Sequence, residues 1–146
     1  MRPERTHFWE GRSYAVVGVS DKKGRLGTSV LKDLQKRGYQ VFAVNRRVKL
    51  IGNQKCYGRL RDISGHLDGV VIIAGPEGAK EAIGECISLG VRRVWLFPGR
   101  KCDEAIKLAK ENGIELIHRA CPLLYLQPAE FPHSLHRWIV KSLGRL

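Results

Sequence analysis

The stretch Tyr14-Ala-Val-Val-Gly-Val-Ser-Asp-Lys-Lys-Gly-Arg-Leu-Gly27 joins a short apolar run to a helical pattern through a glycine-rich turn. Residues 14–19 have the composition of a buried strand, and Val30, Leu31 and Leu34 form an apolar stripe at helical spacing within residues 28–37. Such a turn commonly binds a phosphate, because the amides at the start of the helix face the ligand. Its pattern is G-x-S-x₃-G-x₂-G rather than the G-x-G-x-x-G of most dinucleotide sites. The motif therefore leaves the ligand open.

The alternation of strand and helix continues to residue 118. The predicted strands are 14–19, 40–44, 70–74, 93–97 and 114–118, and the predicted helices are 28–37, 77–89 and 101–112, with a short helical turn at 60–67. The three helices are followed by Gly38, Gly90 and Gly113, as expected at helix C-termini. Helical crossovers imply parallel strands. We therefore predict an α/β fold with a doubly wound, mainly parallel, five-stranded Rossmann-like sheet.

A chain of 146 residues is long enough for one domain. We assign residues 1–13 to an N-terminal lead-in, 14–121 to the core and 122–146 to a C-terminal extension. In that extension Leu135, Trp138, Ile139 and Leu143 predict an amphipathic helix. It would pack on its own domain or on a second copy, giving a homodimer, rather than on a membrane surface or another protein.

The fold predicts where a ligand would bind, because ligand loops follow the C-terminal ends of parallel strands. These loops are 18–27, 45–52, 74–77, 97–100 and 118–122. In the first loop, Gly18 allows close backbone approach and Ser20 offers a hydroxyl, and the cationic side chains are Lys22, Lys23 and Arg25. The alternative interpretation is a solvated basic loop without a ligand.

Charge narrows the class of ligand. The net charge is +12, and residues 21–61 hold twelve basic and two acidic residues. An NAD site usually has a carboxylate at the end of the second strand, but this chain has Asn45-Arg46-Arg47. Guanidinium groups suit a ribose phosphate, which leaves NADP and coenzyme A (CoA) as candidates. A nucleic-acid-binding or regulatory role is a third class, although no helix-turn-helix is visible.

Other features limit location and chemistry. The chain has no signal-peptide pattern and its longest wholly apolar run is 70–74, so we expect a cytoplasmic protein with no membrane segment. The cysteines, Cys56, Cys86, Cys102 and Cys121, are far apart and are interpreted as reduced thiols.

No arrangement of residues predicts a catalytic site. There is no convincing Ser-His-Asp order and no paired carboxylate in a ligand loop. The candidates for a metal site or a reactive thiol are His118, Cys121, His133 and His136, but packing roles are favoured. We therefore expect no catalytic or metal residues. Cys121 is retained as a candidate reactive thiol that would form a mixed disulfide with CoA.

The order and spacing of the motifs resemble a known family, the small stand-alone CoA-binding proteins. These are Rossmann-like domains related to the CoA-binding domain of succinyl-CoA synthetase. The matching stretches are Ala15–Ser20, Gly27, Gly38-Tyr39, Val41, Val44-Asn45, Asp68–Ile72, Pro76-Glu77, Gly90, Val94–Leu96, Gly99, Gly113-Ile114 and Cys121, with Phe8-Trp9 and Phe131–Trp138 resembling one branch. The chain departs from many members at Arg46, where they have proline, and at Phe97, where they often have glutamine.

The resemblance implies a module that binds CoA or an acyl-CoA, and it favours a non-catalytic role over an enzyme. The diphosphate would lie over the first loop, at Gly18, Val19, Ser20, Lys23, Arg25, Leu26 and Gly27. The adenosine and its phosphate would lie near Asn45, Arg46 and Arg47, between walls formed by Ala74, Gly75 and Pro76 and by Phe97, Pro98 and Gly99. An NADP-dependent oxidoreductase is the enzymatic alternative.

Overall fold

The computed structural model describes residues 8–19, 26–97 and 102–118. The strands in this part of the chain are β1 (Ser13–Val17), β2 (Gln40–Val44), β3 (Leu50–Ile51), β4 (Gln54–Tyr57), β5 (Gly69–Ile72), β6 (Arg93–Leu96) and β7 (Glu115–Ile117). The α-helices are α2 (Leu26–Lys36), α3 (Pro76–Leu89) and α4 (Asp103–Glu111), and the 3₁₀ turns are η1 (Phe8–Glu10) and η2 (Leu60–Asp62).

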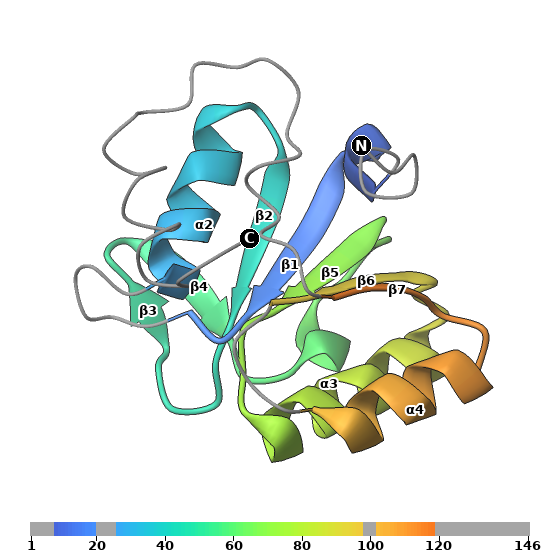
Figure 1. Ribbon diagram of the computed structural model, residues 1–146. Coiled ribbons are helices and arrows are strands. Elements are labelled where there is room, and N and C mark those ends of the chain that lie inside the picture. The colour runs from blue at the N-terminus through green and yellow to red at the C-terminus, as the bar shows by residue number, and fades with distance from the viewer. Residues whose placement is uncertain (1–7, 20–25, 98–101, 119–146) are drawn as a thin grey trace.

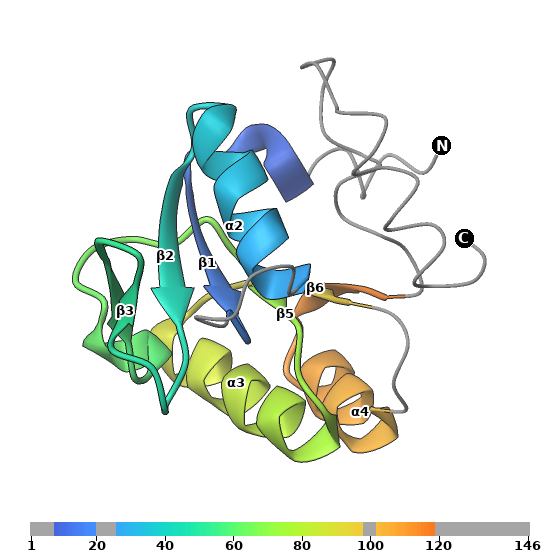
Figure 2. The same cartoon turned by 90° about the vertical axis from the view of Figure 1, so that its left-hand side faces the viewer.

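The strands form one sheet in the order β3-β4-β2-β1-β5-β6-β7. Every pairing is parallel except that of β3 with β4. Helix α2 covers one face of the sheet, and α3 and α4 cover the other (Figures 1 and 2). The chain leaves β1 toward β2 on one side and later returns to β5 on the other. The carboxyl ends of β1 and β5 are therefore the switch point where such sheets bind ligands.

Alternating side chains of the central strands supply two separate cores. Tyr14 and Val16 of β1 join the α2 side, together with Phe8, Trp9 and Trp95. On the other face, neighbouring strand residues pack with α3 and α4, including Ala15, Val70, Ile72, Val94 and Leu96. A sheet covered on both faces explains why β5 is apolar at every position.

The predicted fold class is confirmed. All five predicted strands are present, shifted by no more than two residues at either end. Gly38, Gly90 and Gly113 have φ of 92°, 77° and 71°, as expected for residues that end helices. The structure adds β3, which lies within the predicted basic loop 45–52, and β4, which follows that loop and was not predicted. The predicted C-terminal amphipathic helix lies outside the described residues.

Asp68, which directly precedes β5, binds the backbone at the start of β1. Its Oδ2 accepts hydrogen bonds from the amides of Arg12 (2.8 Å) and Ser13 (3.0 Å), and its Oδ1 lies 2.9 Å from His66 Nε2. The hydrogen bonds from Ser13 and Arg12 lower the pKa of the Asp68 carboxyl. The carboxylate therefore stabilises the fold above its unfolded pKa of about 3.9, and this contribution is lost as pH falls through the lower folded pKa.

We expect Asp68→Ala to lower the free energy of unfolding by about 1–2 kcal/mol at pH 7, because two amides lose their acceptor. The gap between wild type and variant should narrow at pH 3, where the wild-type carboxylate starts to take up a proton. Urea denaturation at both pH values measures this, with Asp68→Asn as the control that keeps an acceptor oxygen. An equal gap at the two pH values would contradict the role of the charged form.

Candidate functional site

A cavity of about 520 Å³ lies at the carboxyl ends of β1, β2 and β5, against helix α3. It is therefore at the switch point of the sheet. Its lining combines small residues at the strand ends with charged residues on the surrounding elements: Val17, Gly18, Val44, Asn45, Arg46, Arg47, Gly58, Ala74, Gly75, Glu77, Gly78, Glu81, Ala82 and Glu85.

Gly18 brings the end of β1 into direct contact with the neighbouring strands. Its amide donates to the carbonyl of Val44 (3.0 Å), and its φ is +104°. A Cβ atom at this position would lie 1.9 Å from the carbonyl oxygen of Ile73, so no side chain fits. Gly18 therefore contributes only backbone to the lining of the cavity.

Gly27 has the matching role at the start of α2. A Cβ atom there would lie 2.5 Å from the carbonyl oxygen of Gly18 and 2.9 Å from the Cα of Val19. The first turn of α2 therefore lies directly against the end of β1. A helix N-terminus held this close to the switch point favours binding of an anion.

Asn45 connects the loops that follow β1 and β2. Its side-chain amide donates to the carbonyl of Val19, and its Oδ1 accepts from the amide of Arg47 (2.8 Å). Its own amide donates to the carbonyl of Tyr57 (2.9 Å), which extends the pairing of β2 with β4. These contacts orient the backbone that carries the two arginines.

The charged wall of the cavity has both signs. Arg46 and Arg47 are exposed on the β2 side, and Glu77, Glu81 and Glu85 line it from α3. Arg46 forms an ion pair with Glu81. The guanidinium groups can bind a phosphate, whereas the carboxylates can accept hydrogen bonds from hydroxyl or amino groups. Glu77 lies in the predicted ligand loop 74–77, but sequence reasoning missed Glu81 and Glu85, although their spacing of four residues on a predicted helix was the available signal.

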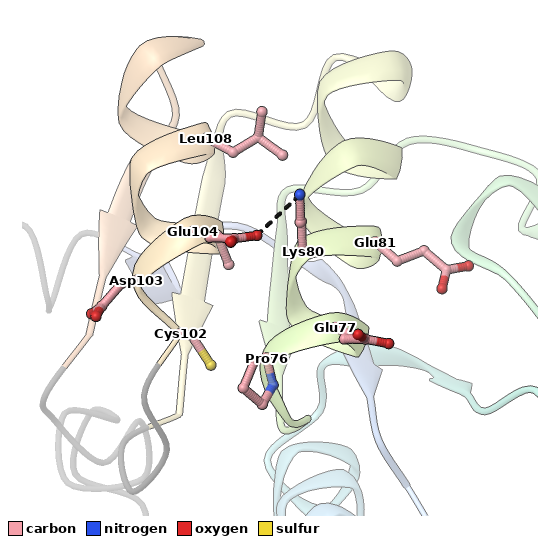
Figure 3. Close-up of a pocket in the computed structure, with 9 residues that line it drawn as sticks. Pro76, Glu77, Lys80, Glu81, Cys102, Asp103, Glu104 and Leu108 are labelled. Atoms are coloured by element: carbon pink, nitrogen blue, oxygen red, sulfur yellow. Dashed lines mark hydrogen bonds and ion pairs between the residues drawn. The ribbon is translucent and has the colours of Figure 1, made fainter.

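A second cavity, of about 800 Å³, lies between the starts of α3 and α4. Figure 3 shows that Lys80 points from α3 toward α4, where its Nζ lies 3.1 Å from Glu104 Oε2. Glu77 and Glu81 point away from α4 in the same view, although both also border this cavity. The two cavities are therefore neighbours on either side of the first turns of α3.

The cavity at the switch point brings together six of the predicted site residues: Gly18, Asn45, Arg46, Arg47, Ala74 and Gly75. Gly27 packs beside it, Leu26 begins α2, and Pro76 borders the second cavity. Val19 and Phe97 instead are buried in the core on the α2 side and do not line either cavity. The remaining predicted residues lie outside the described part of the chain: Ser20, Lys23, Arg25, Pro98, Gly99 and Cys121.

The described thiols are buried. Cys56, Cys86 and Cys102 all lie in the interior of the protein, and burial raises the pKa of Cys86 to about 12. Within residues 8–19, 26–97 and 102–118, no three His, Cys, Asp or Glu side chains are grouped so as to hold a metal ion. No helix in the same ranges has the length and apolar character needed to cross a membrane. His133 and His136 lie outside these ranges, whereas His118 is partly buried directly after β7.

Known proteins resemble this chain over most of its length. A family model described as "CoA binding domain" matches residues 12–127. The alpha subunit of acetate–CoA ligase (ADP-forming) II from Pyrococcus furiosus is 27% identical over 126 residues, which are 79% of this chain and 28% of that subunit. This chain thus spans little more than a quarter of that relative. The uncharacterized protein YneT of Bacillus subtilis is 29% identical over 107 residues, covering 73% of this chain and 79% of YneT.

Solved structures give the same picture. A hypothetical protein from Pyrococcus horikoshii is similar with a TM-score of 0.79 and 27% identity, covering 86% of this chain and 89% of that protein. A conserved hypothetical protein from Pyrococcus furiosus has a TM-score of 0.73 and 27% identity, covering 78% of this chain and 98% of that protein.

Proposed function

This chain belongs to the CoA-binding domain family, and from that premise we propose that it binds CoA or an acyl-CoA in the cavity at the switch point. Gly18 and the start of α2 would receive the diphosphate, and Arg46 and Arg47 would bind the 3′-phosphate. We further propose that the chain works in the cytosol as a binding or regulatory module without a reaction of its own.

The observation that carries this proposal is the meeting of two arginines with bare backbone at one cavity. Gly18 offers a surface without side chains, and Gly75 precedes the first turn of α3. Arg46 and Arg47 stand at the rim, on a backbone oriented by Asn45. A ligand with a diphosphate and a separate monoester phosphate, as CoA has, matches these two features.

The same arginines favour a second candidate, because the 2′-phosphate of NADP is also a ribose monoester. We therefore propose calorimetric titration at physiological salt with CoA, dephospho-CoA, NADP and NAD in parallel. CoA is expected to bind at one site, with dephospho-CoA weaker by about 100-fold because the charge-assisted interactions with both arginines are lost.

Each other outcome contradicts the proposal in its own way. Preference for NADP would move the protein to the oxidoreductase class. No binding of any of the four ligands would leave the basic segment for another partner, with nucleic acid tested next. A nucleic-acid complex would weaken steeply with salt, because counterions are released on binding.

A further inference from the structure

We infer that Glu81 competes with the ligand's phosphate for Arg46, so that binding of CoA requires Arg46 to exchange one anion for the other. This inference rests on the proposed function and assigns a residue of α3 to the selection of the ligand. Its premise is that the ion pair between Arg46 and Glu81 lies at the cavity that both residues line.

The geometry puts this carboxylate in the right place. Glu77, Glu81 and Glu85 follow one another at intervals of four residues, so they share one face of α3. Glu81 points away from α4 (Figure 3) and reaches the guanidinium of Arg46. Glu85 differs, because its Oε2 lies 3.4 Å from the backbone amide of Arg61. Among these three carboxylates, Glu81 is therefore the one that forms an ion pair with Arg46.

The charge balance explains why an exchange is needed. The described lining of the cavity carries three carboxylates and two guanidinium groups. A phosphate monoester carries about −1.5 to −2 charges at neutral pH, so it would meet net negative charge while Arg46 remains with Glu81. A phosphate therefore gains Arg46 as a counterion only by breaking the ion pair with Glu81.

The exposure of the pair makes the exchange feasible. The side chains of Arg46 and Glu81 are 58% and 38% exposed. Ion pairs this accessible to water hold weakly and are easily broken. A ligand without the 3′-phosphate provides no anion that binds Arg46, so Arg46 remains paired with Glu81. Glu81 therefore moderates affinity for CoA and has little influence on dephospho-CoA.

The test compares Glu81→Gln with wild type by calorimetric titration of CoA and dephospho-CoA. We expect Glu81→Gln to bind CoA about fivefold more tightly, the upper range for loss of an exposed ion pair, and to bind dephospho-CoA within twofold of wild type. Glu104→Gln is the matched control, because it removes an exposed carboxylate of α4 that is also paired with a cation, Lys80, on the side of α3 that faces α4. It should leave both affinities unchanged.

A double-mutant cycle measures how far the effect of Glu81 on CoA affinity depends on Arg46. In an Arg46→Gln background, Glu81→Gln should lose most of its effect on CoA, because the competition needs the guanidinium. CoA binding that Glu81→Gln leaves unchanged, or an equal gain for dephospho-CoA, would overturn this inference while the proposed function stands. Failure of the wild type to bind CoA would overturn the proposed function and this inference with it.

Discussion

Replacement of Gly18 by alanine is expected to lower the free energy of unfolding by about 3 kcal/mol or more, which is large for a single methyl group. Two costs combine. The backbone at Gly18 has a φ of +104°, which residues other than glycine rarely adopt. In addition, the new Cβ would lie 1.9 Å from the carbonyl oxygen of Ile73, so the ends of β1 and β5 must move apart.

Gly38→Ala separates these two costs. Gly38 also has a positive φ, of 92°, but a Cβ atom there meets nothing within 4 Å. Gly38→Ala should therefore lower the free energy of unfolding by less, about 1–2 kcal/mol, and this decrease should come from backbone strain alone. Thermal denaturation measures both: each kcal/mol lowers Tm by about 2–4 °C in a domain of this size. Equal losses in the two variants would show that the close approach at Gly18 has no energetic consequence.

The order of the main elements could be predicted because the sequence encodes it locally. Apolar runs such as 70–74 and the glycines that end the helices determine strands and helix ends without reference to distant residues. β3 and β4 could not be predicted in this way. They have only two and four residues. β4 pairs with β2 and β3 pairs with β4, so both form by contact with a neighbouring strand rather than by their own pattern.

The candidate site was predicted in part for a similar reason. The fold fixes which loops meet at the switch point, so Gly18, Asn45 and Gly75 could be assigned to one place. The orientation of side chains could not be assigned. Phe97 directly follows β6 and was expected at the cavity, but it turns into the core on the α2 side. Nor could the ion pair of Arg46 be predicted, because its partner Glu81 lies on another element, thirty-five positions later.

The second large effect is expected when both guanidinium groups are removed. We expect the double variant Arg46→Gln/Arg47→Gln to bind CoA about 100-fold more weakly, because each charge-assisted hydrogen bond to a phosphate contributes about 1.5 kcal/mol at the lower end of its range. Binding of dephospho-CoA should change by less than threefold. Both arginines are exposed, so the fold should be unaffected. Calorimetric titration with the two ligands measures the difference.

The control must remove the same charge elsewhere, because a basic protein attracts any anion. Lys107 and Lys110 are exposed on α4, and neither lines the cavity at the switch point. Lys107→Gln/Lys110→Gln therefore removes two cations and should leave the affinity for CoA nearly unchanged. An equal loss in both double variants would mean that net charge, rather than the rim of the cavity, attracts CoA. An equal loss for CoA and dephospho-CoA in the arginine variant would mean that these arginines contact a part of the ligand other than the 3′-phosphate.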